Sequence, residues 1–220
     1  MKKRTRFANA SDDSGISNDV AAHAVATISH YRLGLAQGAR VRLALLAAFP
    51  FPAPQGSQWF AAEQARALSA AGADVTLFCY GSGDGRPHDG IRVVRIPEAL
   101  SPRRMRAGFD ASKWRADWEL GEAFLAAHAA EPFDAILGHN AEAALVALRV
   151  RPAAGIPVVY VAHTLWRQEL ESYLPRLFSL PAGWAGAALD LTIARSADAV
   201  LTLSECGREA LARAARGPTR

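Results

Sequence analysis

The fold is decided by VRLALLAAFPFPAPQGSQWFAAEQARALSAAGADVTLFCY, residues Val41 to Tyr80, which predicts a strand, a loop, a helix and a second strand in succession. Val41 to Ala48 is an almost unbroken apolar run, which is typical of a parallel strand buried on both faces. Apolar side chains at helical spacing from Trp59 to Ala71 predict a helix, and Gly72 supplies the left-handed residue that commonly follows one. The stretch therefore predicts a βαβ unit.

The loop of this unit, Phe49 to Gln58, carries three prolines and then Gly56 and Ser57. Glycine allows a sharp turn and a close approach of the backbone to a bound molecule, and we expect Ser57 to cap the helix. The free N–H groups of a helix N-terminus favour an anion such as a phosphate. An ordinary strand-to-helix loop without a ligand fits the same residues, so both interpretations stay open.

Composition restricts the class of protein. With 220 residues, of which 50% are hydrophobic and 21% charged, the chain can bury one substantial core. A formal charge of +4 is too small to predict a nucleic-acid partner, although it suits a phosphorylated ligand or an anionic membrane surface. Since no targeting segment or membrane-spanning run is found, we expect a cytoplasmic protein, at most peripheral to the inner face of the membrane. Cys79 and Cys206 are expected to be reduced thiols, with no metal site.

The chain divides into three parts. Residues 1–40 form a polar N-terminal extension that we expect to be disordered or partly helical, because it contributes few apolar side chains to any helix or strand face. Residues 41–216 form the folded domain, and residues 217–220 form a tail where a linker to a second domain would begin. After the βαβ unit, Gly81 to Gly85 is expected to be a turn and Ile91 to Ile96 a third strand.

The segment from Glu98 to Lys113 breaks the regular pattern and clusters Arg103, Arg104 and Arg106. This basic loop is either simply solvated or contacts a phosphate or a lipid surface. In the helix that follows, which reaches about Ala130, we interpret Trp114 and Trp118 as packing residues.

Two later strands end in polar side chains. Asp134 to His139 is followed by Asn140, and Pro157 to Ala162 is followed by His163 and Thr164. In an open α/β sheet these positions border the crevice in which ligands bind, so we expect the histidines and the Gly56 loop to converge at one edge.

The rest of the chain again alternates predicted helices and strands. Leu165 to Phe178 predicts a helix, in which Glu169 and Glu171 are two residues apart and therefore point in different directions, unlike a catalytic pair. Pro181 is expected to end this helix before a second one, Trp184 to Arg195, and a last strand and helix follow. The predicted class is α/β: a single Rossmann-like, doubly wound, mostly parallel sheet flanked by helices.

These residues carry a family resemblance. PFPAPQGS and its helix, DAILGHN, IPVVYVAHTLWRQEL and ARSADAVLTLSE, in this order, resemble the N-terminal half of the retaining, GT-B-fold glycosyltransferases of family 4. The resemblance covers about Val41 to Arg216. It implies an acceptor-side domain of a transferase that moves a sugar from a nucleotide-sugar to an acceptor with retention. The nucleotide-sugar is then a co-substrate, and no further cofactor is expected.

The resemblance also implies roles for individual residues. Gly56 and Ser57 fall on the loop that approaches the donor phosphates and sugar, and His163 falls on the catalytic histidine that contacts the donor sugar. The acceptor or cleft-lining positions are His139, Asn140, Thr164, Trp166 and Glu169. No metal ligand is implied.

Two departures from the family pattern affect the expected activity. Ser57 stands where the family usually has a second glycine, and no Glu-x7-Glu pair, which the family uses to bind the nucleotide, occurs in these 220 residues. We therefore expect the chain to be inactive alone and to associate with a polypeptide that supplies the second domain, or with itself. A non-catalytic binding domain derived from a glycosyltransferase stays open as the alternative. A nicotinamide-dependent oxidoreductase is disfavoured, since no G-x-G-x-x-G joins the first strand to its helix.

Overall fold

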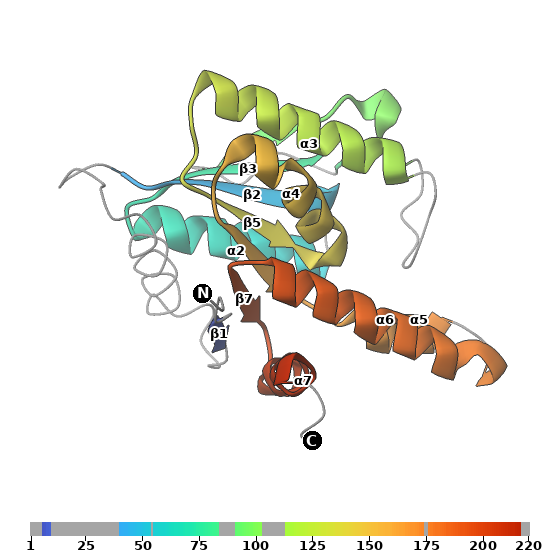
Figure 1. The fold of residues 1–220 in the computed structure, drawn as a ribbon. Coiled ribbons are helices and arrows are strands. Elements are labelled where there is room, and N and C mark those ends of the chain that lie inside the picture. The colour runs from blue at the N-terminus through green and yellow to red at the C-terminus, as the bar shows by residue number, and fades with distance from the viewer. Residues whose placement is uncertain are drawn as a thin grey trace.

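The computed structural model describes residues 6–9, 40–53, 55–83, 91–102, 113–173 and 176–216. The described residues form one seven-stranded sheet in the order β1-β7-β6-β5-β2-β3-β4, and every neighbouring pair of strands is parallel (Figure 1). The strands are β1 (Arg6–Asn9), β2 (Arg42–Pro50), β3 (Asp74–Tyr80), β4 (Arg92–Arg95), β5 (Ala135–His139), β6 (Val158–Ala162) and β7 (Ala199–Thr202). The helices are α2 (Gly56–Ala70), α3 (Lys113–Ala130), α4 (Asn140–Ala154), α5 (Trp166–Tyr173), α6 (Arg176–Ser196) and α7 (Glu205–Arg216), with a short 3-10 turn at Glu98–Leu100.

The predicted βαβ unit is confirmed and lies in the middle of the sheet. β2 pairs with β3 on one side and with β5 on the other, and its residues from Leu43 to Phe49 are buried. Gly72 follows α2 with a φ of 93°, the left-handed geometry expected of it. The predicted Ser57 cap is wrong, because Gln55 already has extended backbone and the helix begins at Gly56, which leaves Ser57 inside the first turn.

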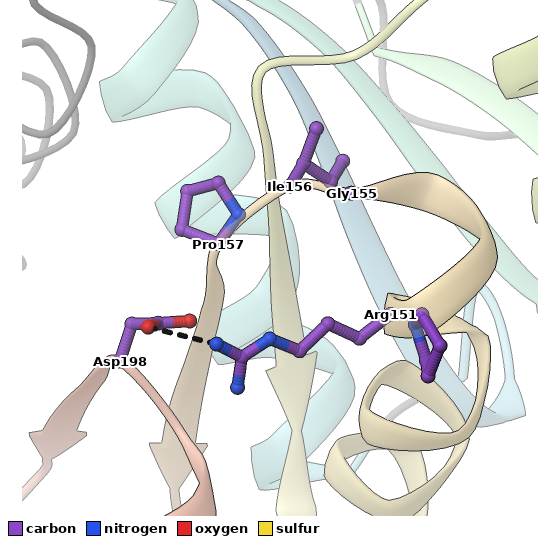
Figure 2. Close-up of a pocket in the computed structure, with 6 residues that line it drawn as sticks. Arg151, Gly155, Ile156, Pro157 and Asp198 are labelled. Atoms are coloured by element: carbon purple, nitrogen blue, oxygen red, sulfur yellow. Dashed lines mark hydrogen bonds and ion pairs between the residues drawn. The ribbon is translucent and has the colours of Figure 1, made fainter.

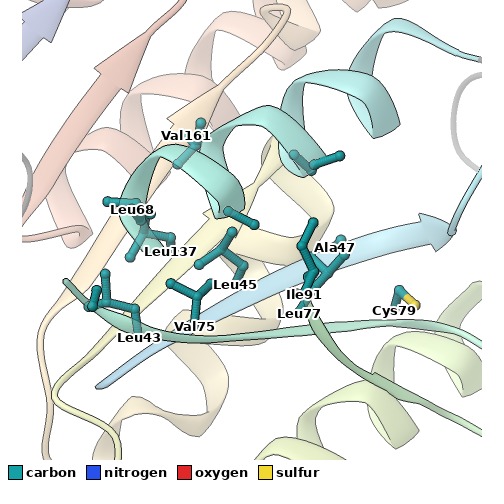
Figure 3. Packing of buried hydrophobic residues seen from close by; sticks show 14 of the residues in the cluster. Leu43, Leu45, Ala47, Leu68, Val75, Leu77, Cys79, Ile91, Leu137 and Val161 are labelled. Carbon is teal, nitrogen blue, oxygen red and sulfur yellow. The ribbon is translucent and has the colours of Figure 1, made fainter. Parts of the chain in front are cut away.

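Helices cover both faces of the sheet, which confirms the doubly wound α/β class. On one face α2 packs against the central strands through a cluster that includes Leu45, Leu68 and Leu137 (Figure 3). On the other face α3 and α4 pack against β2, β3, β5 and β6, and α6 continues this layer over β6 and β7. Burying apolar area on both faces of a parallel sheet supplies most of the stabilisation of such a fold.

The tryptophans of α3 do not pack in the core, contrary to the sequence-based interpretation. Trp114 and Trp118 are 68% and 59% exposed. The helix instead buries the stripe Ala116, Leu120 and Phe124, which recurs every four residues and faces away from both indoles. The Arg149 guanidinium of α4 lies 4.0 Å from the centre of the Trp118 ring, so this indole joins two helices at the surface.

The break predicted at Pro181 is also wrong, since α6 runs without interruption from Arg176 to Ser196. Proline removes one backbone hydrogen bond, and here it stands near the start of a long helix that packs along α5. This packing outweighs the local preference. Figure 1 shows the α5–α6 pair extending beyond the sheet.

Residues from the predicted N-terminal extension add an edge strand. Arg6–Asn9 forms β1, which pairs in parallel with Ala199–Thr202 of β7. Four residues with a single large apolar side chain give no strand pattern that sequence inspection could detect. The basic cluster Arg103, Arg104 and Arg106 lies outside the described residues, as does Gly85 of the predicted turn. No helix in the described part of the chain is long and apolar enough to cross a membrane.

Candidate functional site

The two strand-end histidines meet at the carboxyl edge of the sheet. His139 ends β5 and His163 follows β6, and Nδ1 of His139 lies 3.0 Å from Nε2 of His163. Their ring centres are 5.2 Å apart. The predicted convergence of these two side chains is therefore present in the structure.

Side-chain alternation explains why both histidines lie on the same face of the sheet. Successive residues of a strand point to opposite faces, so His139 follows Leu137 and His163 follows Val161 on one side. Both apolar residues belong to the core cluster beneath α2. The histidines therefore lie at the end of this core, on the side that α2 covers.

Phe60 connects the histidines to the loop after β2. Its ring meets the His163 ring edge-on at 4.9 Å and lies 6.3 Å from the His139 ring. Phe60 is four residues beyond Gly56, in the first turns of α2, so the N-terminus of this helix is next to the histidine pair. The helical spacing from Trp59 to Ala71 predicts an apolar face but does not show which partner that face will meet, so the sequence does not reveal this contact.

His139 is fully buried, although its position at a strand end predicts a cleft-lining side chain. Its side chain has no accessible surface, and its Nε2 has no hydrogen-bond partner in the part of the chain that the structure describes. Burial and the neighbouring His163 hold the pKa of His139 well below its ordinary value, and burial lowers the pKa of His163 to about 4. Both imidazoles are therefore neutral at neutral pH. His163 is the one of the two that keeps partial exposure.

Asn140 has an unusual backbone conformation. Its φ of 66° makes it the one non-glycine residue with positive φ in the described part of the chain, and its Oδ1 is buried without a partner. Such conformations cost free energy and occur preferentially at functional sites. The positive φ of Asn140 allows β5 to pass directly into α4 at this edge. Gly138 contributes to the same junction, since a Cβ there would lie 2.7 Å from Cα of Ala144.

The remaining predicted positions surround the start of α5. Thr164 is exposed and its hydroxyl donates a hydrogen bond to Oε1 of Glu169, whose pKa is raised mainly by burial. The backbone N–H groups of Trp166 and Arg167 donate to the two carboxylate oxygens of Asp190 on α6, each at 3.1 Å. The Trp166 side chain is partly buried against the cluster between α4, α6 and β6. It therefore contributes to packing as well as to this edge.

A second polar cluster lies on the α3–α4 side and was not found from the sequence. Nζ of Lys113 is 2.8 Å from Oε1 of Glu142, and the Tyr80 hydroxyl donates a hydrogen bond to the carboxylate of Asp117. Burial raises the pKa of Asp117. The four side chains come from β3, α3 and α4, and no local spacing in the sequence relates them. Within the described ranges no three His, Cys, Asp or Glu side chains converge as a metal site would require.

A pocket of about 400 Å³ lies at the opposite edge of the sheet, away from the predicted site residues. Figure 2 shows it between the end of α4 and the starts of β6 and β7, with Arg151 and Asp198 joined across it. Arg151 also donates to the carbonyl of Ser196, and Asp198 accepts from the backbone N–H of Val158. These contacts connect a helix end to two strands, so we assign the pair a structural role.

Solved structures support the fold. The chain is similar to the sucrose-phosphate synthase of Thermosynechococcus elongatus, with 20% sequence identity and a TM-score of 0.60. The match covers 79% of this chain and 45% of that one, so the chain spans less than half the length of that enzyme. At this identity the likeness concerns the fold alone. No curated protein matches the sequence.

The family is shown by the sequence itself. Residues 55–220 match the model of the glycosyl transferase 4-like domain, which is three quarters of the chain and includes the start of α2 and both strand-end histidines. Together with the fold, this match confirms the resemblance to the N-terminal domain of GT-B-fold glycosyltransferases. The chain belongs to the glycosyl transferase 4-like domain family.

Proposed function

We propose that this domain is the acceptor-side half of a glycosyltransferase that moves a sugar from a nucleotide-sugar to an acceptor with retention of configuration. The observation that carries the proposal is the meeting of His163 with Phe60 at the carboxyl edge, beside the N-terminus of α2. In open α/β sheets this edge is where ligands bind.

Each part of the edge has a role in this proposal. His163 hydrogen-bonds a hydroxyl of the donor sugar, and the first-turn N–H groups of α2 at Gly56 and Ser57 face the donor phosphates. On the other side of His163, Asn140, Thr164 and Glu169 offer polar atoms to the acceptor. Trp166 supports them through its contact with the core. The nucleotide-sugar is a co-substrate, and no step in this proposal uses another cofactor.

The nucleotide itself is bound by a second domain outside these 220 residues. The coverage of only 45% of the sucrose-phosphate synthase chain supports this division, as does the single sheet described here. Holding both substrates in one geometry supplies much of the rate of a transferase, so the 220-residue chain alone is expected to give no useful turnover. The second domain approaches this same edge in our proposal, whichever polypeptide carries it.

Saturation-transfer NMR tests the proposal on the purified chain. The probes are UDP-glucose, UDP-N-acetylglucosamine and GDP-mannose, each at millimolar concentration. For at least one probe we expect the sugar protons to receive more saturation than the base protons, because this domain contacts the sugar. His163→Ala should abolish that difference.

His128→Gln is the matched control for this experiment. His128 is the last-turn histidine of α3, and its Nδ1 accepts from the backbone N–H of Phe133, away from the carboxyl edge. The control should bind like the wild type. The proposed function is contradicted if the wild-type protein transfers saturation to none of the probes. It is also contradicted if binding survives in His163→Ala.

A further inference from the structure

The contact between the two histidines restricts where their protons lie. Nδ1 of His139 and Nε2 of His163 are 3.0 Å apart, so one of these nitrogens donates a hydrogen bond and the other accepts it. The low pKa values that burial gives both rings leave each of them neutral at neutral pH, with one N–H and one bare nitrogen. The direction of the bond therefore fixes the tautomer of both rings.

The second nitrogen of His139 decides this direction. Nε2 of His139 is buried and has no hydrogen-bond partner among the described residues, in a side chain without accessible surface. A buried N–H without an acceptor is rarer and more costly than a buried acceptor without a donor. The proton of His139 is accordingly on Nδ1, which donates to His163.

We infer that His139 is a positioning residue that holds His163 in the Nδ1–H tautomer by donating to its Nε2. None of the described residues hydrogen-bonds Nδ1 of His163, and the side chain keeps partial exposure, so this N–H is available to a ligand. The edge-on contact with Phe60 restricts rotation of the His163 ring. The fixed donor suits a hydroxyl or phosphate oxygen as acceptor.

The inference deepens the proposed function, since it says how His163 would contact a sugar, but its first test needs no ligand. Long-range ¹H–¹⁵N correlation spectra of the imidazole rings at pH 8 distinguish a protonated from a bare nitrogen. We expect His163 to be protonated at Nδ1. His128 provides an internal reference with the opposite pattern, because its Nδ1 accepts from Phe133 and its proton must be on Nε2.

Two variants separate positioning from packing. His139→Asn retains an N–H donor near the position of Nδ1 and should keep the wild-type tautomer of His163. His139→Leu fills the same space without a donor, and His163 should then change to the tautomer mixture of a free imidazole. Circular dichroism and the amide spectrum establish that each variant is folded. Should His139→Leu fail to fold, the wild-type and His139→Asn spectra still decide the inference.

Binding of the three nucleotide-sugars then tests the consequence. His139→Leu should bind the best probe about threefold to tenfold more weakly, the loss expected for one misdirected hydrogen bond, and His139→Asn should restore the affinity. His163 protonated at Nε2 in the wild type, or an unchanged tautomer in folded His139→Leu, would overturn the inference. If the tautomers are as inferred and no probe binds, the positioning role of His139 stands and the proposed function fails.

Discussion

Lys113 and Glu142 form an ion pair that joins the first turn of α3 to the first turn of α4. Nζ of Lys113 lies 2.8 Å from Oε1 of Glu142, and the side chains are 8% and 22% exposed. A pair with so little access to water has to be well bonded to offset its desolvation. The pair lies on the opposite helical layer from the histidines.

The charges of Lys113 and Glu142 should affect the pKa of Asp117. Burial raises the pKa of Asp117, Lys113 opposes that rise and Glu142 adds to it. Lys113→Met should therefore raise the pKa of Asp117 further, whereas Glu142→Gln should lower it. Carboxyl ¹³C NMR titration measures both changes. Shifts of the same sign in the two variants would show that the pair does not act on Asp117 through its charges.

Substitution by alanine should have different effects on stability at two glycines of the strand-to-helix junctions. A Cβ at Gly138 would overlap the backbone of Ala144, so Gly138→Ala is expected to destabilise the protein by about 1–3 kcal/mol. At Gly56 no atom of the described residues lies within 4 Å of an added Cβ, and the stability of Gly56→Ala should stay within about 0.5 kcal/mol of the wild type. Urea unfolding gives both values. Equal stability of the two variants would contradict the packing of α4 on β5.

The low pKa of His163 should make stability depend on pH. Burial lowers this pKa to about 4 in the folded state, below its value in the unfolded chain. The unfolded state then binds more protons between these values, so folding stability is lost as pH falls from about 6.5 towards 4. Between pH 7 and 4.5 the free energy of unfolding of the wild type should fall by about 2 kcal/mol more than that of His163→Gln. Urea unfolding at each pH measures both values. An identical pH dependence of the two proteins would mean that His163 is not buried as described.

Much of the fold could be predicted because the decisive signals are local. The apolar run of β2, the helical spacing before Gly72 and the strands ending in His139 and His163 each lie within one short segment. Parallel strands place their carboxyl ends at one edge, so the meeting of the histidines followed from topology alone.

The partners of these residues could not be predicted, because they depend on contacts between distant segments. Phe60 approaches His163 only when α2 lies across the sheet, and Lys113 meets Glu142 only when α3 and α4 pack together. The sequence predicts Trp118 as a packing residue, although Leu120 and Phe124 belong to the stripe that the helix buries. Burial depends on which face of the helix meets the sheet, and hydrophobicity alone does not determine it.

The two cysteines should differ in reactivity. Cys79 is buried in β3, where burial raises the pKa of its thiol to about 12, whereas Cys206 is exposed in the first turn of α7. The thiolate is the reactive form, so Ellman's reagent at pH 8 should modify Cys206 at once and Cys79 only after denaturation. Cys206→Ser provides the control, which should show no rapid phase. Rapid reaction of both thiols in the folded protein would contradict the packing of β3.

The account's central claim is that ligands bind at the carboxyl edge beside His163. Amide chemical-shift mapping of the ¹⁵N-labelled chain with UDP-glucose, UDP-N-acetylglucosamine and GDP-mannose tests it most directly. We predict that at least one probe shifts the signals of residues 56–60, 139–140 and 163–169, and leaves those of Arg151, Gly155 and Asp198 unchanged. Shifts confined to the pocket between Arg151 and Asp198, or no shifts with any probe, would contradict the claim.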